Sequence, residues 1–350
     1  MKHIRRLLLV LFAFSGTAVV GQYTDQINSN RPGYSIGAFA VGKNVVQFES
    51  GTEMRRYNHT GYNNSTVNGQ VAFLSIRYGL LMEILEVTYE GAFMFDKLTN
   101  NTTSSPIEKK RKGFLQNFLG LKVLVYDPFK KEQEVNVYSW KANNGFKLRD
   151  LIPAVSLTVG ANYNPLSEPP YSYGNLFQTL TNPLLFQHTG TSVAEESPFS
   201  LRGTLATQTH FFNTWVFVTN LNYNRFLTDY PEMSWILTLT HTFDPIWSAY
   251  LEYQGIEGTF YKDQIFRLGA AYLVNDNMQV EATIGANTKT TPSWISLNAG
   301  VSYRLDFHKD FQSAEEIEEK RLKKEEKNLK KTLKKNTKSE KKRIRKARRN

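Results

Sequence analysis

The clearest alternation of apolar and polar residues along the chain runs from Trp294 to Phe307. One set of alternate positions is apolar: Ile295, Leu297, Ala299, Val301, Tyr303 and Leu305. The other set is small or polar: Ser296, Asn298, Gly300, Ser302 and Arg304. Because alternate side chains of a strand point to opposite faces, this segment predicts a strand with one apolar and one polar face. A transmembrane barrel would turn the apolar face to lipid and the polar face to its lumen.

The same two-residue period recurs throughout the preceding chain and predicts further strands. Their ranges are 45–57, 69–78, 83–95, 113–126, 151–163, 199–212, 214–224, 233–243, 246–255, 264–274 and 278–286. Short turns alternate with longer segments between these strands, as in bacterial outer-membrane barrels. We therefore predict an all-β fold, a transmembrane antiparallel β-barrel of about 12 strands that occupies residues 45–307.

The predicted loops divide between the two sides of the membrane. Those assigned to the extracellular side are 57–65, 96–112, 165–198, 225–232, 256–263 and 287–293. Strand parity places the long segment 127–150 in the periplasm, although periplasmic turns are usually short. Loops as long as 165–198 are uncommon unless they bind, cover or plug something, so we expect this loop to act as a lid or constriction.

The N-terminal residues predict export. Residues 1–21 have the basic start and apolar centre of a secretory signal peptide, and the mature chain would begin at Gln22. An uncleaved anchor helix is the alternative, but the apolar run falls short of the ~20 residues that a span needs. Residues 22–44 contain the turn-forming sequence Asn30-Arg31-Pro32-Gly33, and we expect them to form a periplasmic segment before the barrel.

The net charge of +11 comes almost entirely from the C-terminal tail, 308–350, which we place in the periplasm. The tail consists of helix-forming residues and ends in a basic cluster: Lys341, Lys342, Arg343, Arg345, Lys346, Arg348 and Arg349. One interpretation is a solvated helix with a disordered basic end. The other is an electrostatic contact with anionic headgroups, the cell wall or an acidic periplasmic protein. Nucleic acid is not an expected partner, because the chain carries an export signal.

Charged residues of both signs fall on the inward positions of the predicted strands. They are Glu49, Glu53, Arg55, Arg77, Glu86, Glu90, Lys122, Arg202, Glu252, Arg267, Glu281 and Arg304. Two pairs, Arg77 with Glu86 and Arg267 with Glu281, are expected at similar depth across a turn. These residues would form either an internal network of ion pairs that rigidifies a narrow barrel or a lining that selects solutes by charge.

The sequence offers no motif for catalysis, a metal or a cofactor. Cysteine is absent, and no HExxH, GxSxG, P-loop or EF-hand pattern occurs. His241 is predicted to point outward and His210 inward, without a serine that clearly pairs with either. We expect no enzymatic activity and no cofactor.

Several segments resemble a known family. Asn30-Arg31-Pro32, then 41–51 and 76–87, resemble the openings of the outer-membrane transporter family associated with the meta pathway of phenol degradation. Residues 249–255 and 267–280 are similar to family segments too. The family usually has Asp where this chain has Asn30. The resemblance spans roughly 30–306 and implies a Bacteroidota-type outer-membrane barrel, nominally a transporter, with no implication that phenol is its substrate.

The sequence therefore predicts a passive outer-membrane channel or transporter for small solutes, of unknown substrate. The alternative is a non-conducting structural or accessory barrel in an envelope complex, with the basic tail as its docking element.

Overall fold

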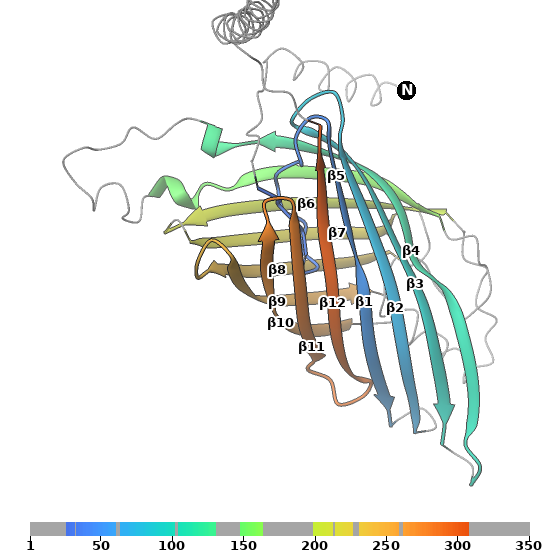
Figure 1. Cartoon of the computed structure of the whole chain (residues 1–350). Coiled ribbons are helices and arrows are strands. Elements are labelled where there is room, and N and C mark those ends of the chain that lie inside the picture. The colour runs from blue at the N-terminus through green and yellow to red at the C-terminus, as the bar shows by residue number, and fades with distance from the viewer. Residues whose placement is uncertain are drawn as a thin grey trace, which may run out of the picture. The chain divides into compact units, whose positions relative to one another are not determined.

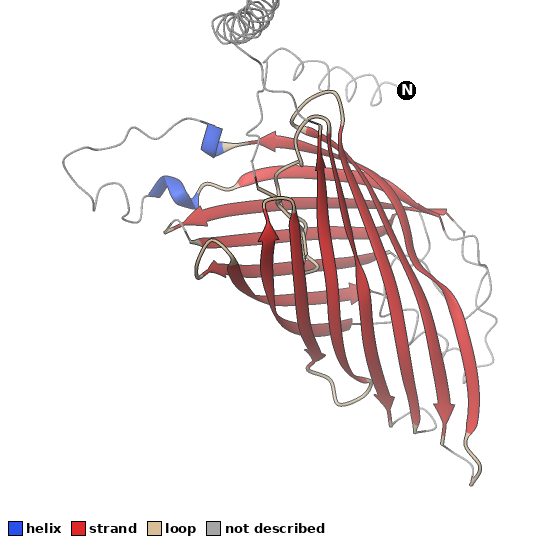
Figure 2. Cartoon of the chain, in the orientation of Figure 1, coloured by secondary structure: helices blue, strands red, loops and turns tan. Residues whose placement is uncertain are grey.

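The computed structural model describes residues 26–31, 33–60, 64–101, 104–130, 148–163, 199–212, 214–226, 231–258 and 262–307. Within these residues, antiparallel strands form one closed barrel (Figures 1 and 2). The strands are β1 (Val45–His59), β2 (Ser65–Gly79), β3 (Leu85–Asn100), β4 (Ile107–Tyr126), β5 (Ala154–Tyr163), β6 (Phe199–Phe211), β7 (Trp215–Phe226), β8 (Glu232–Thr242), β9 (Trp247–Gly258), β10 (Lys262–Asn275), β11 (Met278–Asn287) and β12 (Ser293–Asp306). The predicted fold class is confirmed.

Each strand pairs with its neighbours in sequence, and β12 closes the barrel by pairing with β1. This closing pair runs from Val45 opposite Asp306 to Asn58 opposite Ser293. Among the described residues between β4 and β5, two short 3-10 helices occur, η2 (Pro128–Lys130) and η3 (Leu148–Leu151). No helix among the described residues is long and apolar enough to cross a membrane.

The barrel has two different ends. At the end where β1 begins and β12 finishes, hereafter the turn end, short connections join β2 to β3, β6 to β7, β8 to β9 and β10 to β11. The connection between β4 and β5 at this end is longer. The opposite end, hereafter the loop end, carries the connections 60–64, 101–106, 164–198, 227–231, 259–261 and 288–292.

Large apolar side chains cover the outward face of the barrel and are exposed along most of its strands. Examples are Leu119, Val159, Leu221, Leu251, Leu268 and Leu297. Inward positions on the same strands are polar and buried, as Ser156, Asn220 and Thr238 are. This reversal of the usual soluble pattern is what a barrel surrounded by lipid requires.

Aromatic side chains border the apolar band. Near the turn end, the Trp215 ring lies 4.2 Å from His241, and the Trp247 ring lies 4.8 Å from Tyr272 (centroid distances). Such aromatic groups favour the interface between lipid and water. His241 is therefore part of an interfacial aromatic cluster.

The predicted loop 96–112 is wrong for most of its length. Strand β3 continues to Asn100 and β4 already begins at Ile107, so the two strands form a long ribbon. The loop was inferred from the polar, lysine-rich sequence. A strand that extends beyond the membrane needs no apolar outward face, so its polar residues pair as well as apolar ones do.

An arginine introduced on the lipid face tests the membrane position. Leu251 lies between Leu239 and Leu268 within the apolar band. We expect Leu251→Arg to lower the free energy of unfolding in lipid vesicles by about 2–4 kcal/mol, as measured by urea titration followed by tryptophan fluorescence. Met233→Arg is the matched control, because Met233 is equally exposed but lies at the loop end, where the expected cost is ~1 kcal/mol or less. Equal losses for both variants would contradict the assignment.

Candidate functional site in the barrel lumen

The N-terminal segment lies inside the barrel. We expected residues 22–44 outside it in the periplasm, and for the described part this is wrong. Ile27 is held at the turn end, where its N–H donates to the Asp276 carbonyl at 2.7 Å. Tyr34 reaches Glu53 in the middle of β1, and the chain then returns to begin β1 at Val45. Residues 27–31 and 33–41 thus form a loop in the lumen, hereafter the plug.

The first limb of the plug is held by the two strands that close the barrel. Ser29 Oγ lies 2.8 Å from Ser302 Oγ of β12 and donates to Glu49 of β1 at 3.3 Å. The Asn30 N–H donates to the same Glu49 carboxylate at 3.1 Å. One inward carboxylate on β1 therefore fixes two successive residues of the plug.

The tip of the plug is anchored by two buried carboxylates. Glu252 accepts the N–H groups of Tyr34 and Ser35 at 2.9 and 3.2 Å, and the Tyr34 hydroxyl donates to Glu53 at 2.7 Å. The Arg267 guanidinium lies over the Tyr34 ring at 4.0 Å and is paired with Glu252 at 2.8 Å. Burial of a carboxylate costs several kcal/mol, and hydrogen bonds to charged groups return roughly 1.5–3 kcal/mol each, so Glu252 needs several donors.

The second limb is bound by amide side chains on the opposite wall. Asn220 of β7 accepts the Ile36 N–H at 2.6 Å and donates to the Ile36 carbonyl at 2.8 Å. Gln208 of β6 accepts the Ala38 N–H at 3.0 Å. These side chains satisfy buried backbone groups that have no strand partner.

Arg77 of β2 joins the two limbs. Its guanidinium donates to the carbonyls of Asn28 on the first limb and Phe39 on the second, at 2.9 and 3.2 Å. It also forms a two-contact pair with Glu86 of β3, at 2.8 and 2.9 Å. Glu86 in turn accepts the Val41 N–H at 2.9 Å. The planar guanidinium can serve all these acceptors at once, whereas the ammonium of a lysine could not match the two-contact geometry.

A small aromatic cluster covers the plug toward the turn end. The Phe39 ring packs against His210 of β6 and Phe129 of η2, with centroids 5.9 and 6.2 Å away. The Phe39 carbonyl also accepts a hydrogen bond from Lys122 at 2.7 Å. His210 thus serves as a packing residue beneath the plug.

Two glycines allow the plug to adopt its path. A Cβ on Gly33 would lie 2.6 Å from the Glu252 carboxylate, so a larger residue there would have to displace this anchor. Gly42 has φ of 89°, a left-handed conformation that favours glycine, where the chain turns from the plug into β1.

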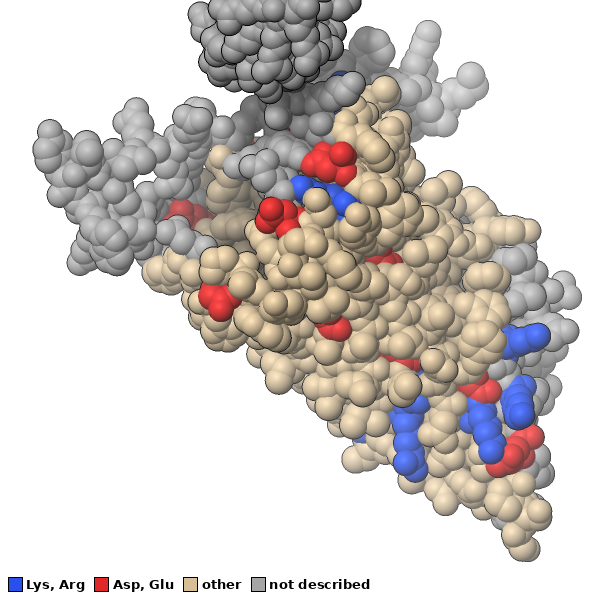
Figure 3. All heavy atoms as spheres, viewed as in Figure 1, with Lys and Arg blue, Asp and Glu red and all other residues tan. Residues whose placement is uncertain are grey.

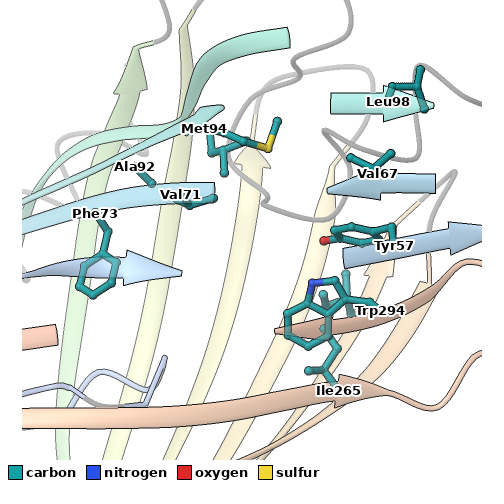
Figure 4. Close-up of a cluster of buried hydrophobic side chains, with 11 residues drawn as sticks. Tyr57, Val67, Val71, Phe73, Ala92, Met94, Leu98, Ile265 and Trp294 are labelled. Atoms are coloured by element: carbon teal, nitrogen blue, oxygen red, sulfur yellow. The ribbon is translucent and has the colours of Figure 1, made fainter. Parts of the chain in front are cut away.

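The loop-end half of the lumen has a different character. Inward side chains of β1, β2, β3, β4, β9, β10 and β12 form an apolar cluster there, part of which Figure 4 shows. The cluster comprises Tyr57, Val67, Val71, Phe73, Ala92, Met94, Leu98, Leu115, Ile256, Ile265 and Trp294. The guanidinium of Arg31 in the plug lies 3.7 Å from the centroid of the Phe73 ring, where plug and cluster meet.

A cavity of about 150 Å³ lies between the plug tip and the barrel wall. Phe73, Val71 and Ala92 form an apolar part of its lining, whereas Asn222 and Ser234 contribute polar groups from β7 and β8. The cavity therefore combines an apolar and a hydrogen-bonding surface.

An ion pair spans the wall of this cavity. Arg202 of β6 reaches across β5 and β4 to Glu90 of β3 at 2.8 Å, and its guanidinium lies 3.5 Å from the centroid of the Phe118 ring. Phe118 can lie flat here because Gly120 and Gly160 have no side chains, and a Cβ on either would clash with the ring. Glu90 is partly exposed to the cavity and also accepts a hydrogen bond from Gln116.

The structure buries most of the charged residues assigned to the lumen. Those buried are Glu49, Glu53, Arg55, Arg77, Glu86, Lys122, Arg202, Glu252, Arg267, Glu281 and Arg304. The expected pair of Arg77 with Glu86 is present. The expected pair of Arg267 with Glu281 is wrong, because the register sets Arg267 directly opposite Glu252. Within the described ranges no cluster of three or more His, Asp or Glu could hold a metal ion.

Three sets of predictions lie outside the described residues. They concern the signal peptide 1–21, the loop 165–198 and the basic tail, including Lys341, Lys342, Arg343, Arg345, Lys346, Arg348 and Arg349.

Sequence reasoning missed the plug and the apolar cluster. The plug lacks any two-residue period, so it looked like an ordinary leader to the barrel. The apolar cluster did leave a signal, because Tyr57, Val67, Val71 and Phe73 are apolar at positions that strand parity directs inward.

Comparison with known proteins assigns the family. A family model described as "Putative MetA-pathway of phenol degradation" matches residues 29–305. The chain belongs to this family. The match begins within the plug, so the family's shared sequence includes the lumenal loop as well as the strands. No curated protein matches the chain.

Solved barrels are similar to the chain at low identity. An outer membrane channel from Pseudomonas putida F1 is 11% identical, with a TM-score of 0.48 over 79% of this chain and 100% of that one. The porin KdgM, solved with disordered oligogalacturonate, is 10% identical, with a TM-score of 0.39 over 75% of this chain and 99% of its own. The translocator domain of the autotransporter NalP from Neisseria meningitidis is 10% identical, with a TM-score of 0.42 over 79% and 90%.

An engineered disulfide tests the position of the plug. The chain has no native cysteine, so Ser29→Cys with Ser302→Cys would introduce a single possible pair. We expect mild oxidation to link these positions, whose side-chain oxygens lie 2.8 Å apart, and intact-protein mass and tryptic peptide mapping would show the link.

The matched control combines Ser29→Cys with Ser296→Cys. Ser296 also points inward from β12, but it lies six residues farther along the strand, roughly 20 Å away at ~3.3 Å per residue. Equal linkage in both variants, or none in either, would contradict the described position of Ser29.

Proposed function

We propose that the protein is a passive outer-membrane channel for small solutes, and that the plug gates the turn-end half of its lumen. One observation carries this proposal. The plug is bound mainly by inward side chains, whereas the strands pair with one another into a closed barrel that includes no strand from the plug. Displacement of the plug would therefore cost its side-chain contacts but leave the barrel closed.

The lining of the cavity supports a class of solute. Phe73 and Val71 offer an apolar surface, and Asn222 and Ser234 offer hydrogen-bonding groups across the same space. A small solute with one apolar face and one polar edge would satisfy both surfaces. Because Arg202 and Glu90 are paired with each other, this part of the cavity wall would present little net charge to such a solute.

The orientation follows from the asymmetry of the connections. Outer-membrane barrels have short turns in the periplasm and longer loops outside the cell. We therefore assign the turn end, the entry of the plug and the tail 308–350 to the periplasm. The loop 165–198 then belongs to the extracellular side, where its role as a lid stays a prediction.

Conductance in planar bilayers tests the gate. We expect deletion of residues 27–40 to raise the conductance of single channels severalfold, because it removes the contents of the turn-end half. We expect the oxidised Ser29→Cys/Ser302→Cys variant to conduct least, and reductant to return it to the level of the wild-type protein.

The control is the Ser29→Cys/Ser296→Cys variant, whose conductance should not respond to reductant. One contrary outcome is that the oxidised Ser29→Cys/Ser302→Cys variant leaves the conductance unchanged while the deletion raises it. In that case solutes pass beside a static plug, and gating by the plug is refuted. If the deletion variant also fails to conduct although it folds, the channel itself is refuted.

A second function is favoured by the extent to which the plug fills the lumen. A barrel that stays closed would be a structural or accessory subunit, docked through the basic tail to an acidic periplasmic protein or an anionic surface. This function requires that the plug deletion not conduct. It also requires that an envelope protein co-purify with the full chain and be lost after truncation at Phe307.

A further inference from the structure

The outward face of β1 to β4 carries a row of polar residues near the loop end. Strand register places Arg56, Asn68, Lys97 and Lys110 side by side across the four strands. The next row toward the turn end contains Met54, Gln70, Phe95 and Lys112. Figure 3 shows basic side chains gathered at this far end of the four long strands, with acidic side chains among them.

Most of these cations are available to a ligand. Arg56, Lys110 and Lys112 are exposed. Lys97 forms an ion pair with Glu108 at 2.6 Å, and both of these side chains are about half exposed. Asp96, which is next in sequence to Lys97, points inward and is buried.

An apolar surface begins directly beside the basic rows. Phe93 packs against Phe95 and Phe114, with ring centroids 4.9 Å apart in both pairs. Met54 and Phe95 are more than half exposed, although they lie on strands in a closed sheet. A groove of about 1000 Å³ runs here, and its lining includes Arg56, Lys110 and Lys112 together with Met54, Phe95 and Leu297.

The height of the basic row coincides with the edge of the membrane. Arg56 is eleven positions beyond Val45 on β1. At ~3.3 Å per residue and a tilt of ~40°, this distance corresponds to roughly 28 Å along the barrel axis, against an apolar band of ~25 Å. Arg56 and Lys110 therefore lie at headgroup level, and Lys112 and Phe95 lie one row nearer the turn end, just inside it.

We propose that this groove binds an anionic lipid of the outer leaflet. Arg56, Lys110 and Lys112 would contact its phosphate groups, and its acyl chains would lie on Met54, Phe95 and Leu297. Charge complementarity selects this occupant, because three exposed cations beside an apolar face match a phosphorylated headgroup with chains beneath it. This inference requires that the loop end lies on the extracellular side of the membrane, as assigned in the proposed function. It does not depend on whether the lumen conducts.

Lipid binding to the full-length protein in detergent tests the proposal. The probe is a bis-phosphorylated glucosamine lipid, titrated against the protein and followed by native mass spectrometry. We expect the triple variant Arg56→Gln/Lys110→Gln/Lys112→Gln to bind roughly 100-fold more weakly, since each cation near an anionic surface contributes about fivefold. Heat-modifiable gel mobility would show that the variant is folded.

The matched control is Lys262→Gln, also an exposed cation near the loop end but paired with Glu257 at 2.5 Å. Its lipid affinity should equal that of the wild-type protein. Unchanged affinity of the triple variant would overturn the proposal, as would equal binding of a phosphate-free analogue. Competition by inorganic phosphate at concentrations like those of the lipid would indicate a simple anion site and overturn the assignment to a lipid.

Discussion

A buried carboxylate needs donors, and this requirement organises the lumen. Glu49, Glu53, Glu86 and Glu252 all point inward in a barrel too narrow for each to be solvated. Arginines on the strands meet part of the need, as Arg77 and Arg267 do. Further donors come from strand side chains, as Thr238 and Gln47 do, and from the N–H groups and hydroxyls of the plug. The carboxylates of the wall thus hold the plug in place, and the plug supplies donors that the arginines do not.

The charged lumen was expected to be either a rigid network of ion pairs or a lining that selects solutes. The two ends of the lumen differ in this respect. Toward the turn end, the charges form a network with the plug and leave little space. Nearer the loop end, Arg202 and Glu90 border a cavity and the lining becomes apolar around Phe73 and Met94. Charged side chains are also buried near the loop end, as Glu232 at the start of β8 and Asp263 in β10 are. A solute that enters from there would therefore meet apolar and charged side chains together.

The sequence predicted the strands well because the lipid face imposes a strict two-residue period, as on β12, where apolar positions such as Ile295 alternate with polar ones such as Ser296. It predicted the extent of β3 and β4 poorly, because that period fades where strands leave the membrane. Arg267 was given the wrong partner because a partner depends on register between strands, which one sequence does not state. The plug was missed because its contacts join residues far apart in the chain, as Tyr34 and Glu252 are.

The contacts of Ser29 have a consequence for assembly. This residue precedes β1, yet it touches Glu49 on β1 and Ser302 on β12, the first and last strands to be synthesised. The junction between those strands is the seam at which the sheet becomes a cylinder. Pairing along the seam brings together both partners of Ser29, so Ser29 can make these two contacts at once only when the barrel has closed. The seated plug is therefore a sign, within the folded chain, that β12 has paired with β1.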